Sequence, residues 1–398
     1  MRLLLVHNKY RTISPGGEDK VFEQEAELLR AAGHDVVAYT RSNDEMDESS
    51  CFDQFAVLAG MQRSRRSFRE LSQLIERTSP DIAHFHNTFP LISLSAYQAC
   101  RQRRVPVVQT LHNFRLVCAV GTHYREGSPC EQCRPGSPWA AVRHRCYRNS
   151  TTASLAVAAM ISRNHFSGAT RQWVDRYIAL GSFAKDRLLS MGVEAEKISL
   201  KPNFVNRSHI MWQSAGVQQR ERPYALFVGR LSPEKAVLNL LRAWVDLRDV
   251  PLRIVGVGPD LEPARRLAEE LNLAVDFLGF LGRDEVLEQM AYARCLVVSD
   301  GCYEAGVPLV IIEAWSVGVP VVVPQRGSMT SLLDGVDSAI FAGFHDGSFQ
   351  RAVRAVWSNS MFQEKISVGG QERWRCDHSP EVSLASLLSI YHSVQSIS

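Results

Sequence analysis

Two carboxylates flank a glycine-bearing loop and a predicted short helix in the segment SDGCYEAGVPLVIIEAWSVGVPVVV, which begins at Ser299. Pro308 is expected at the first helical position and Gly318 just beyond the last, the usual asymmetry of helix ends. The unpaired backbone N–H groups at such a helix N-terminus favour an anionic ligand. Glu304 and Glu313 flank this position, and a carboxylate accepts hydrogen bonds from two hydroxyls at once. The pattern predicts a ligand with phosphate and hydroxyl groups, such as a nucleotide sugar; two glutamates of purely structural use are the alternative.

Two cationic side chains follow another predicted strand, in the segment GRLSPEK. Arg230 comes directly after Gly229, and four residues separate it from Lys235. On one pyrophosphate, the guanidinium would give a bidentate grip and the ammonium a mobile point charge. Together they could stabilise the charge that develops on a nucleoside-diphosphate leaving group. The alternative is a surface arginine and lysine near a turn. Gly258 in VGVGP follows the next predicted strand, however, so Arg230, Lys235 and Gly258 are expected at one edge of the sheet.

Two predicted strands of the first half end in histidine, at DIAHFHN (His86) and QTLHNF (His112). Ligands of open parallel sheets lie beyond the carboxyl ends of strands, so both histidines are candidates for a site. We expect His112 to act there and His86 to be a structural hydrogen-bond partner. Gly16 and Gly17 lie in the first strand–helix loop, where a backbone without side chains can approach a phosphate or sugar closely. Paired glycines are also common in ordinary turns.

Four of the nine cysteines lie in a Gly- and Pro-rich insertion: Cys118, Cys130, Cys133 and Cys146. An odd cysteine count without a secretion signal argues against a disulfide framework. A long loop of this composition usually needs a crosslink, which four thiolates around one structural Zn²⁺ would supply. The outer spacings match no standard zinc-finger pattern, so four reduced cysteines, partly buried as small hydrophobic residues, are the alternative.

The elements that position these residues form two successive α/β series. Predicted strands lie at 2–6, 36–39, 81–85, 105–111, 177–180 and 198–200, then at 225–228, in RIVGVGPD, in VDFLG, at 295–299 and directly after Gly318. Predicted helices lie at 18–32, 68–77, 94–102, 155–165 and 183–191, then at 237–247, 261–271, 284–292 and 382–394. The polar stretch 206–222 is the expected linker. This repeated alternation predicts an α/β protein with two doubly wound, Rossmann-like domains facing a cleft.

Composition agrees with this organisation. A chain of 398 residues suits two domains of ordinary size, and 45% hydrophobic with 22% charged residues is typical of a globular protein. The net charge of +3 gives no indication of a nucleic-acid partner. The N-terminus lacks the pattern of a signal peptide, and no apolar run has the length of a membrane span, so we expect a cytoplasmic protein.

Arginines nevertheless gather at three places in the first half: 63–69, 101–104 and 143–148. Clusters of this kind are attracted to anionic lipid surfaces. We therefore expect peripheral association with the inner face of the membrane, with ordinary solvated helix faces as the alternative.

Taken together, the motifs resemble those of the retaining nucleotide-sugar glycosyltransferases of the GT-B fold, a group that includes bacterial polysaccharide and phosphatidylinositol mannosyltransferases. The similarity covers nearly the whole chain: Gly16-Gly17, TLHNF, KPNFV, GRLSPEK, VGVGP and YEAGVPLVIIEA. By this resemblance, residues like Arg230 and Lys235 bind the donor diphosphate, one like Glu313 binds the ribose hydroxyls, and one like Glu304 contacts the donor sugar. The residue like His112 lies beside the reacting carbon. The expected donor-binding set is Gly16, Gly17, Gly229, Arg230, Lys235, Gly258, Glu304, Pro308, Leu309 and Glu313, and the expected catalytic set is His112, Arg230, Lys235 and Glu304.

The resemblance also implies the domain plan. We expect an N-terminal acceptor-side domain at 1–205 that carries the cysteine-rich insertion 118–146. A donor domain is expected at 206–377, and a C-terminal helix at 378–398 is expected to pack back on the first domain.

The chain departs from the family pattern at two positions. Seven residues usually separate the family's two glutamates, whereas eight separate Glu304 from Glu313. Either the loop holds one extra residue or Ala305 takes the acidic position. Ala236 also stands where the family usually has glycine. No Asp-x-Asp triplet, the metal-binding signature of the other main glycosyltransferase fold, occurs in the sequence. Side chains and a helix N-terminus, and no obligatory metal cofactor, are therefore expected to neutralise the diphosphate.

The activity implied by the resemblance is transfer of a sugar from a UDP-, GDP- or ADP-sugar to a glycan or lipid-linked acceptor with retention of configuration, as in surface polysaccharide or glycolipid synthesis. A nucleotide-sugar 2-epimerase of the same fold would need further acid/base residues. A non-catalytic sugar- or nucleotide-binding module would have no need of paired cations at a leaving group. Both remain alternatives.

Overall fold

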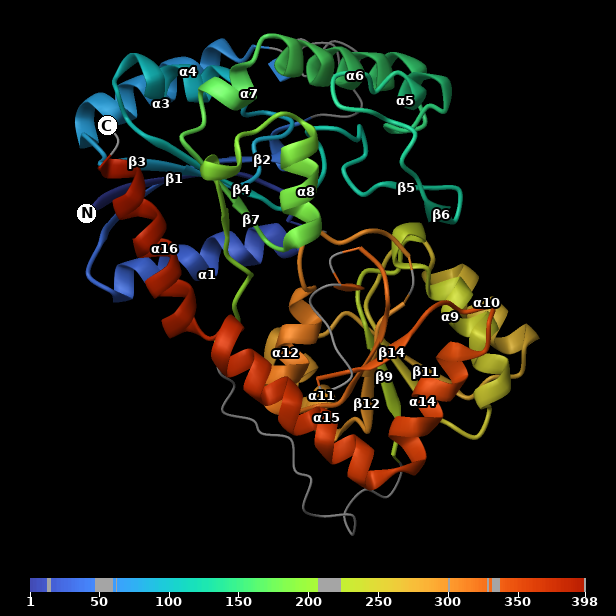
Figure 1. Cartoon of the computed structure of the whole chain (residues 1–398). Coiled ribbons are helices and arrows are strands. Elements are labelled where there is room, and N and C mark those ends of the chain that lie inside the picture. Colours follow the sequence, from blue (N-terminus) through green and yellow to red (C-terminus); the bar gives the residue numbers. More distant parts are fainter. Residues whose placement is uncertain are drawn as a thin grey trace. The chain divides into compact units, whose positions relative to one another are not determined.

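The computed structural model describes residues 1–12, 16–46, 60–61, 63–206, 223–299, 301–327, 329–330 and 337–396. The chain divides into two compact units, coloured along the sequence in Figure 1. Unit 1 comprises Met1–His123, Cys130–Pro202 and Ser383–Ser398, and unit 2 comprises Tyr124–Pro129 and Asn203–Val382. The linker expected at 206–222 lies, apart from its first residue, outside the described residues.

Unit 1 is built on six parallel strands in the order β2-β1-β3-β4-β7-β8. These are β1 (Arg2–Lys9), β2 (Asp35–Ser42), β3 (Ile82–Phe85), β4 (Val107–Leu111), β7 (Arg176–Ala179) and β8 (Ile198–Leu200). The run 3–6 of β1 is fully buried, as a central parallel strand covered on both faces requires. The direction of the strand order reverses between β1 and β3, so a crevice for ligands is expected beyond their carboxyl ends.

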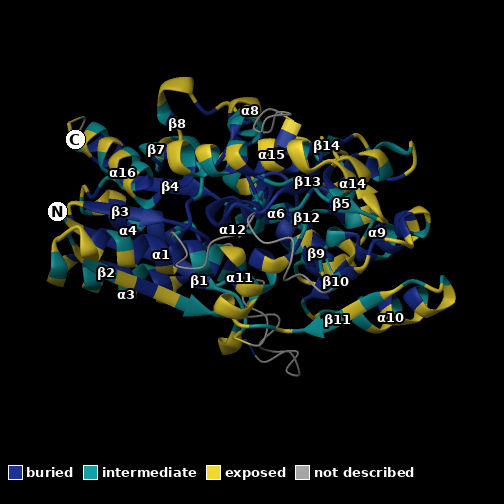
Figure 2. Cartoon of the chain, turned by 90° about the horizontal axis from the view of Figure 1, so that it is seen from below, coloured by how far each residue is buried: buried dark blue, intermediate teal, exposed yellow. Residues whose placement is uncertain are grey.

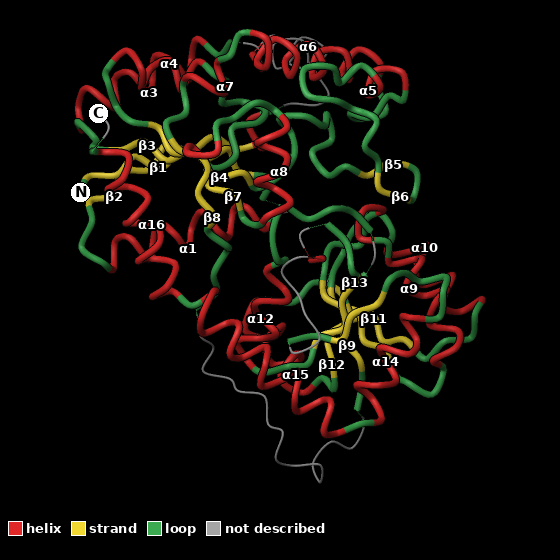
Figure 3. The backbone as a smooth tube through the Cα atoms, in the orientation of Figure 1, coloured by secondary structure: helices red, strands yellow, loops and turns green. Residues whose placement is uncertain are grey.

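Helices cover both faces of this sheet, as the tube in Figure 3 shows. Leu3 and Leu5 of β1 pack on one face with apolar residues of α1 (Gly17–Ala31) and α16 (Pro380–Gln395). On the other face, Phe85 stacks on Tyr97 of α4 at a ring-centroid distance of 4.1 Å. The remaining helices and short elements of this part of the chain are α3 (Arg65–Thr78), α4 (Ser95–Gln102), α5 (Ala140–Arg143), α6 (Thr151–Phe166), α7 (Ala169–Gln172), α8 (Ser182–Ser190), η1 (Asn43–Glu45) and η2 (Ala195–Lys197). A two-stranded hairpin, β5 (Tyr124–Arg125) and β6 (Ser128–Pro129), interrupts unit 1 in sequence.

The C-terminal helix α16 packs in unit 1, as we predicted when we expected it to return to the first domain. Leu387 and Tyr391 are fully buried in one cluster with Leu3 and Leu5. The chain therefore leaves unit 1 after β8 and returns to it only for this last helix.

Unit 2 repeats the parallel architecture with the strand order β11-β10-β9-β12-β13-β14. Its strands are β9 (Ala225–Val228), β10 (Leu252–Val255), β11 (Val275–Gly279), β12 (Cys295–Val297), β13 (Val321–Pro324) and β14 (Ala339–Phe341). The strand order reverses between β9 and β12, which is the order of dinucleotide-binding sheets. The segments that follow these two strands, GRLSPEK and the stretch from Ser299, therefore meet at the switch point.

Two apolar clusters cover the two faces of this sheet, and Figure 2 shows that its edge strand β11 is less buried than the interior of the molecule. Ala225 and Phe227 pack on one face with α9 (Val237–Ala243), α10 (Leu261–Glu270) and α14 (Ser348–Ser358). Leu226 packs on the other face with α11 (Arg283–Tyr292) and α12 (Leu309–Val317). Also present are α15 (Ser360–Arg373) and the short elements η3 (Pro233–Lys235), η4 (Trp244–Leu247) and η5 (Trp374–His378).

The helix predicted after Glu304 is present, with one correction at its start. Gly318 ends α12 with a left-handed backbone, φ 84°, as expected for glycine in that position. Pro308 is the N-cap and not the first helical residue, because its ψ of 140° is extended and the helix begins at Leu309. Across the described part of the chain, no helix combines the length and the apolar character that crossing a bilayer would require.

Candidate functional site

An open pocket lies at the switch point of the unit 2 sheet and encloses about 720 Å³, its mouth included. Four segments supply its wall: the end of β9 with the loop after it, the loop after β12, the start of α12, and the segment after β13. The lining residues are Phe227, Val228, Gly229, Glu234, Lys235, Val298, Ser299, Gly301, Cys302, Glu304, Pro308, Leu309, Val310 and Met329. Of the sequence-predicted donor site, the pocket brings together Gly229, Lys235, Glu304, Pro308 and Leu309.

Lys235 and Glu304 form an ion pair in this wall. Lys235 Nζ lies 2.5 Å from Glu304 Oε1, and the two side chains are 37% and 28% exposed. The Glu304 charge raises the pKa of Lys235 despite partial burial, so the ammonium stays charged. The Ser299 hydroxyl donates to the Lys235 carbonyl and ties the two loops together. The carboxylate at this site belongs to Glu304, while the neighbouring Ala305 is buried.

Arg230 lies on the same loop but does not line the pocket. Its side chain is exposed, and it forms no ion pair with the residues that the structure describes. Arg230 is thus a solvated cation close in sequence to the pocket, whereas Lys235 is part of its wall.

Glycines allow the unit 2 loops to approach one another closely. A Cβ added at Gly258 would lie 2.2 Å from the Leu231 carbonyl oxygen, and one at Gly301 would lie 1.9 Å from the Glu234 carbonyl oxygen. Gly258 also has a φ of +159°. The glycine predicted in VGVGP therefore has a packing role against the loop that carries Lys235, and it does not line the pocket itself.

The N-terminus of α12 opens into the pocket through Pro308, Leu309 and Val310. The first backbone N–H groups of this nine-residue helix have no partner within the helix, which makes its start suited to an anion. Glu313 lies farther along α12, is 6% exposed, and does not belong to the pocket wall. The structure therefore places Glu304 at the wall, whereas Glu313 is buried in α12 and does not line the pocket.

In unit 1, a hydrogen bond joins the loop that contains Gly16-Gly17 to the loop that contains His112. Asn113, directly after His112, donates to Glu18 Oε1 at 2.7 Å, and Glu18 follows Gly17 at the start of α1. Gly16 is the N-cap of α1, and a Cβ there would meet the Tyr10 ring at 2.5 Å. Gly16 and Gly17 thus hold a tight turn next to the histidine loop, in a different unit from the Lys235 pocket.

His112 lines a separate cavity of unit 1, which encloses about 870 Å³ including its mouth. Apolar side chains such as Phe89, Leu116 and Met160 form most of the wall. His112 Nε2 lies 2.9 Å from His86 Nδ1. From the sequence we expected His86 to be a structural hydrogen-bond partner, but no motif indicated Glu25, which contacts His86, or Lys201, which contacts Glu25.

The four cysteines of the insertion lie in one region of unit 1. Burial raises the pKa of the Cys133 thiol to about 11, and Cys118, Cys146 and Cys130 are near enough to contribute. Cys133 and Cys146 pack against an apolar cluster that includes Val157. Within the described ranges, no three of these sulfurs lie inside 4.8 Å of one another, so their arrangement does not match a tetrahedral zinc site.

Two family models together match most of the chain. Residues 15–209 match the model described as Glycosyltransferase Family 4, and residues 212–373 match the one described as Glycosyl transferases group 1. The two matches meet at 209–212, within ten residues of Asn203, where the chain passes from unit 1 to unit 2.

Curated relatives are similar over part of their length. The chain is 29% identical to the GDP-mannose-dependent alpha-(1-6)-phosphatidylinositol monomannoside mannosyltransferase of Mycolicibacterium smegmatis, over 53% of this chain and 58% of the relative. It is 31% identical to a sulfoquinovosyl transferase of Arabidopsis thaliana, over 65% of this chain and 45% of the relative. The chain thus spans about half the length of these relatives.

Solved structures share the architecture over nearly the full chain. Sucrose-phosphate synthase from Thermosynechococcus elongatus superposes with a TM-score of 0.72 and 17% identity, covering 100% of both chains. Anabaena HepE in complex with UDP-glucose has a TM-score of 0.67 and 16% identity, covering 98% of this chain and 99% of that one. At these identities the likeness establishes the fold.

Proposed function

Because the chain belongs to the nucleotide-sugar glycosyltransferases of the GT-B fold, we propose that it transfers a sugar from a nucleotide donor to a glycan or lipid-linked acceptor with retention of configuration. The observation that carries this proposal is the Lys235–Glu304 pair beside the N-terminus of α12, at the switch point of the unit 2 sheet. An ammonium and a helix N-terminus facing one pocket suit a diphosphate, and the carboxylate suits sugar hydroxyls.

In the proposed reaction, the bond between the sugar C1 and the diphosphate oxygen breaks, and its electron pair stays on the diphosphate. Lys235 and the α12 N-terminus stabilise that charge, with Arg230 as the second cation. The acceptor hydroxyl then bonds to C1 from the face that the diphosphate leaves, and its proton passes to the departing diphosphate. His112 of unit 1 contacts the donor sugar. Positive charge for the diphosphate comes from the protein, so we propose that catalysis needs no metal.

Three further proposals concern partners and setting. The donor is a UDP-, GDP- or ADP-sugar, as the GDP-mannose named for one relative and the UDP-glucose named for a neighbouring structure illustrate. The product belongs to a surface polysaccharide or glycolipid. The enzyme works in the cytoplasm, with its arginine clusters against an anionic membrane; Arg65, Arg101 and Arg145 are all exposed.

A panel of UDP-, GDP- and ADP-sugars tests the activity. Release of one nucleoside diphosphate that requires an acceptor extract, with the donor's anomeric configuration kept in the product by NMR, is the expected result. Full activity after chelation is expected as well. Inversion, or activity that returns only with added Mg²⁺ or Mn²⁺, would contradict the proposed mechanism. Epimerised sugar with no transfer product would favour the 2-epimerase, and binding without turnover would favour the non-catalytic module.

The structural zinc remains a prediction, because the sulfurs lie in one region without forming a tetrahedral set. Metal analysis of protein purified without a polyhistidine tag should find about one zinc per chain if the thiolates close around the ion. Absence of zinc, together with Cys130→Ser as stable as the parent, would leave four reduced cysteines that pack as small hydrophobic residues.

A further inference from the structure

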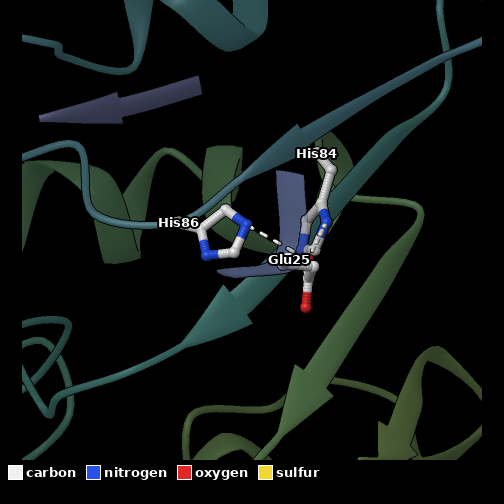
Figure 4. A group of neighbouring side chains, drawn as sticks. All are labelled: Glu25, His84 and His86. Atoms are coloured by element: carbon white, nitrogen blue, oxygen red, sulfur yellow. Dashed lines mark ion pairs between the residues drawn. The ribbon is translucent and has the colours of Figure 1, made fainter. Parts of the chain in front are cut away.

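A series of buried polar contacts runs through unit 1 from Lys201 to His112. Lys201 Nζ lies 3.1 Å from Glu25 Oε2, and Glu25 Oε1 lies 3.3 Å from His86 Nε2. His86 Nδ1 lies 2.9 Å from His112 Nε2. Figure 4 shows the centre of the series, where Glu25 pairs with both His84 and His86. The side chains of Lys201, Glu25 and His86 are at most 4% exposed, so they interact with one another and not with bulk water.

Burial and neighbouring charges fix the protonation of these groups. Burial raises the pKa of the Glu25 carboxyl, but the Lys201 ammonium and the His84 imidazole outweigh it and hold that pKa well below its ordinary value. Burial lowers the pKa of His86 to about 4. Burial, together with His86, also lowers the pKa of His112 well below its ordinary value. At neutral pH Glu25 is therefore a carboxylate, and His86 and His112 are neutral imidazoles.

Each neutral imidazole has one N–H, so its contacts determine which nitrogen carries the hydrogen. His86 Nε2 faces the Glu25 carboxylate, which can only accept, so the hydrogen of His86 belongs on Nε2. His86 Nδ1 then presents a lone pair to His112 Nε2. Two lone pairs 2.9 Å apart would repel, so His112 must carry its own hydrogen on Nε2. Its Nδ1 is left as an acceptor.

We propose that Glu25, in contact with Lys201, is a positioning residue that fixes His112 in the Nε2–H tautomer, so that His112 Nδ1 accepts a hydrogen bond from a ligand hydroxyl. The proposal rests on the proposed function only for the identity of that ligand, the donor sugar. The tautomer itself follows from contacts within unit 1.

The same cluster meets the distance requirement of a three-ligand metal site, since Glu25, His84 and His86 have ligand atoms within 4.8 Å of one another. The ammonium of Lys201 lies 3.1 Å from the same carboxylate and would repel a cation there. Both nitrogens of His84 also contact hydroxyls at 2.8 Å, that of Tyr391 and that of a threonine. These contacts favour a series of polar contacts over a metal site.

Glu25→Gln tests the proposal because it should reverse the tautomer. Lys201 can only donate, so it keeps the amide oxygen at the position of Oε2. The amide NH₂ then takes the position of Oε1, where its two hydrogens face His84 Nδ1 and His86 Nε2 at 3.1 and 3.3 Å. His86 must accept on Nε2 and carry its hydrogen on Nδ1. His86 Nδ1 would then donate to His112 Nε2. Because His112 Nε2 must accept that hydrogen bond, the hydrogen of His112 would lie on Nδ1.

The tautomer is read directly from two-bond ¹H–¹⁵N spectra of the full chain labelled with ¹⁵N-histidine, in which protonated and unprotonated ring nitrogens have different shifts. The parent is expected to show His112 protonated on Nε2, with its signals identified by their loss in His112→Asn. Glu25→Gln is expected to show it protonated on Nδ1. Glu27→Gln, an exposed change on the same helix, should leave the parent pattern. Protonation of parent His112 on Nδ1, or an unchanged tautomer in Glu25→Gln, would overturn the proposal.

Two further measurements keep the test decisive. If Glu25→Gln does not fold, His86→Phe removes the acceptor, and His112 should then exchange between both tautomers; a single Nε2–H form there would overturn the proposal. In activity assays, Glu25→Gln should lower turnover at least about tenfold, as loss of a supporting partner typically does. Its affinity for nucleoside diphosphate should match the parent, because that site lies in unit 2. A reversed tautomer in a protein that transfers no sugar would count against the proposed function alone.

Discussion

The two units hold charged side chains in opposite ways. In unit 2, Lys235 and Glu304 lie 2.5 Å apart with side chains 37% and 28% exposed, at the wall of an open pocket. In unit 1, Lys201 and Glu25 lie 3.1 Å apart and are 4% and 2% exposed. A partly exposed pair can exchange partners with an incoming anion at small cost, whereas separating a buried pair costs several kcal/mol. The first arrangement suits binding and release, and the second suits a fixed orientation.

The largest expected effect is on the buried pair. Lys201→Met leaves the Glu25 carboxylate in the core without a cation, so we expect the free energy of unfolding to fall by about 3–5 kcal/mol. Urea denaturation followed by circular dichroism measures it. Lys185→Met, a partly exposed lysine of the same unit, should change stability by less than about 0.5 kcal/mol. Equal stability of Lys201→Met and the parent would remove the contrast between the units.

Acid should also act on the unit 1 cluster. Folded His86 has a pKa of about 4, whereas an unfolded histidine titrates near 6.5, so the unfolded state binds more protons between these values. Stability should therefore fall as the pH drops from about 6.5 to about 4, by up to roughly 3 kcal/mol for this one group. The groups that face His86 are Glu25, His84, His7 and His112. Glu25, whose pKa is also lowered, adds its own loss only below its ordinary value of 4.5.

Unfolding curves across this pH range compare the parent with His86→Phe, which should show a flatter dependence. His392→Gln, a change at an exposed histidine, should keep the parent slope. Parallel curves for His86→Phe and the parent would mean that His86 is not held neutral in the core.

At the open pocket, the expected loss is in catalysis. Lys235→Ala should lower turnover by roughly 10²-fold or more, because its charge matters most as the diphosphate departs. Arg230→Ala is expected to behave in the same way. Steady-state kinetics with the accepted donor measures both, with Lys365→Ala, an exposed lysine of unit 2, as the control. Near-parent turnover in either variant would remove that residue from the reaction.

A smaller loss is expected at the buried glutamate of α12. Glu313→Ala should weaken binding of the nucleoside diphosphate product by about 1.5–3 kcal/mol, the usual value for a hydrogen bond to a charged group. Titration calorimetry measures the affinity for nucleoside diphosphate, and Glu364→Ala, at an exposed glutamate, is the control. Unchanged affinity would leave Glu313 with the structural role that its burial also allows.

The smallest effects concern the membrane. Arg101 and Arg104 are exposed at the end of α4, while Arg103 between them pairs with Glu76. Each free cation is worth about 1 kcal/mol near an anionic surface, so Arg101→Ala with Arg104→Ala should reduce flotation with anionic liposomes at low salt. Arg103→Ala should reduce it less. Absence of salt-sensitive flotation in the parent would reject membrane association.

The fold was largely predictable because strands buried on both faces appear as short apolar runs. Strand β9 lies at Ala225–Val228 and β8 at Ile198–Leu200, as predicted. The elements β14, α14 and α15 were missed. Strand β14 has only three residues, and α15 contains Gly370, where a Cβ would lie 2.3 Å from the Trp315 ring. That glycine weakens the helical signal in the sequence, and only the tertiary contact explains it.

The candidate site was predictable only where it depends on strand ends. The Lys235 and Glu304 motifs follow β9 and β12, and a parallel sheet brings such ends to one edge. Glu25 had a weak signal, a carboxylate among the apolar positions of α1. Its pairing with Lys201 joins residues 176 positions apart, and no local pattern encodes such a contact. The role of Gly258 in loop packing likewise needed the structure.

The return of α16 to unit 1 affects the order in which the protein can assemble during translation. Unit 2 is complete once Val382 has emerged, whereas unit 1 still lacks the segment from Ser383 onward. Until then, Leu3 and Leu5 lack part of their apolar cover, and His84 lacks the Tyr391 hydroxyl. Domains usually fold in the order of their synthesis. Unit 1, whose synthesis begins first, is therefore completed after unit 2, and the histidine cluster can close only once Tyr391 has emerged from the ribosome.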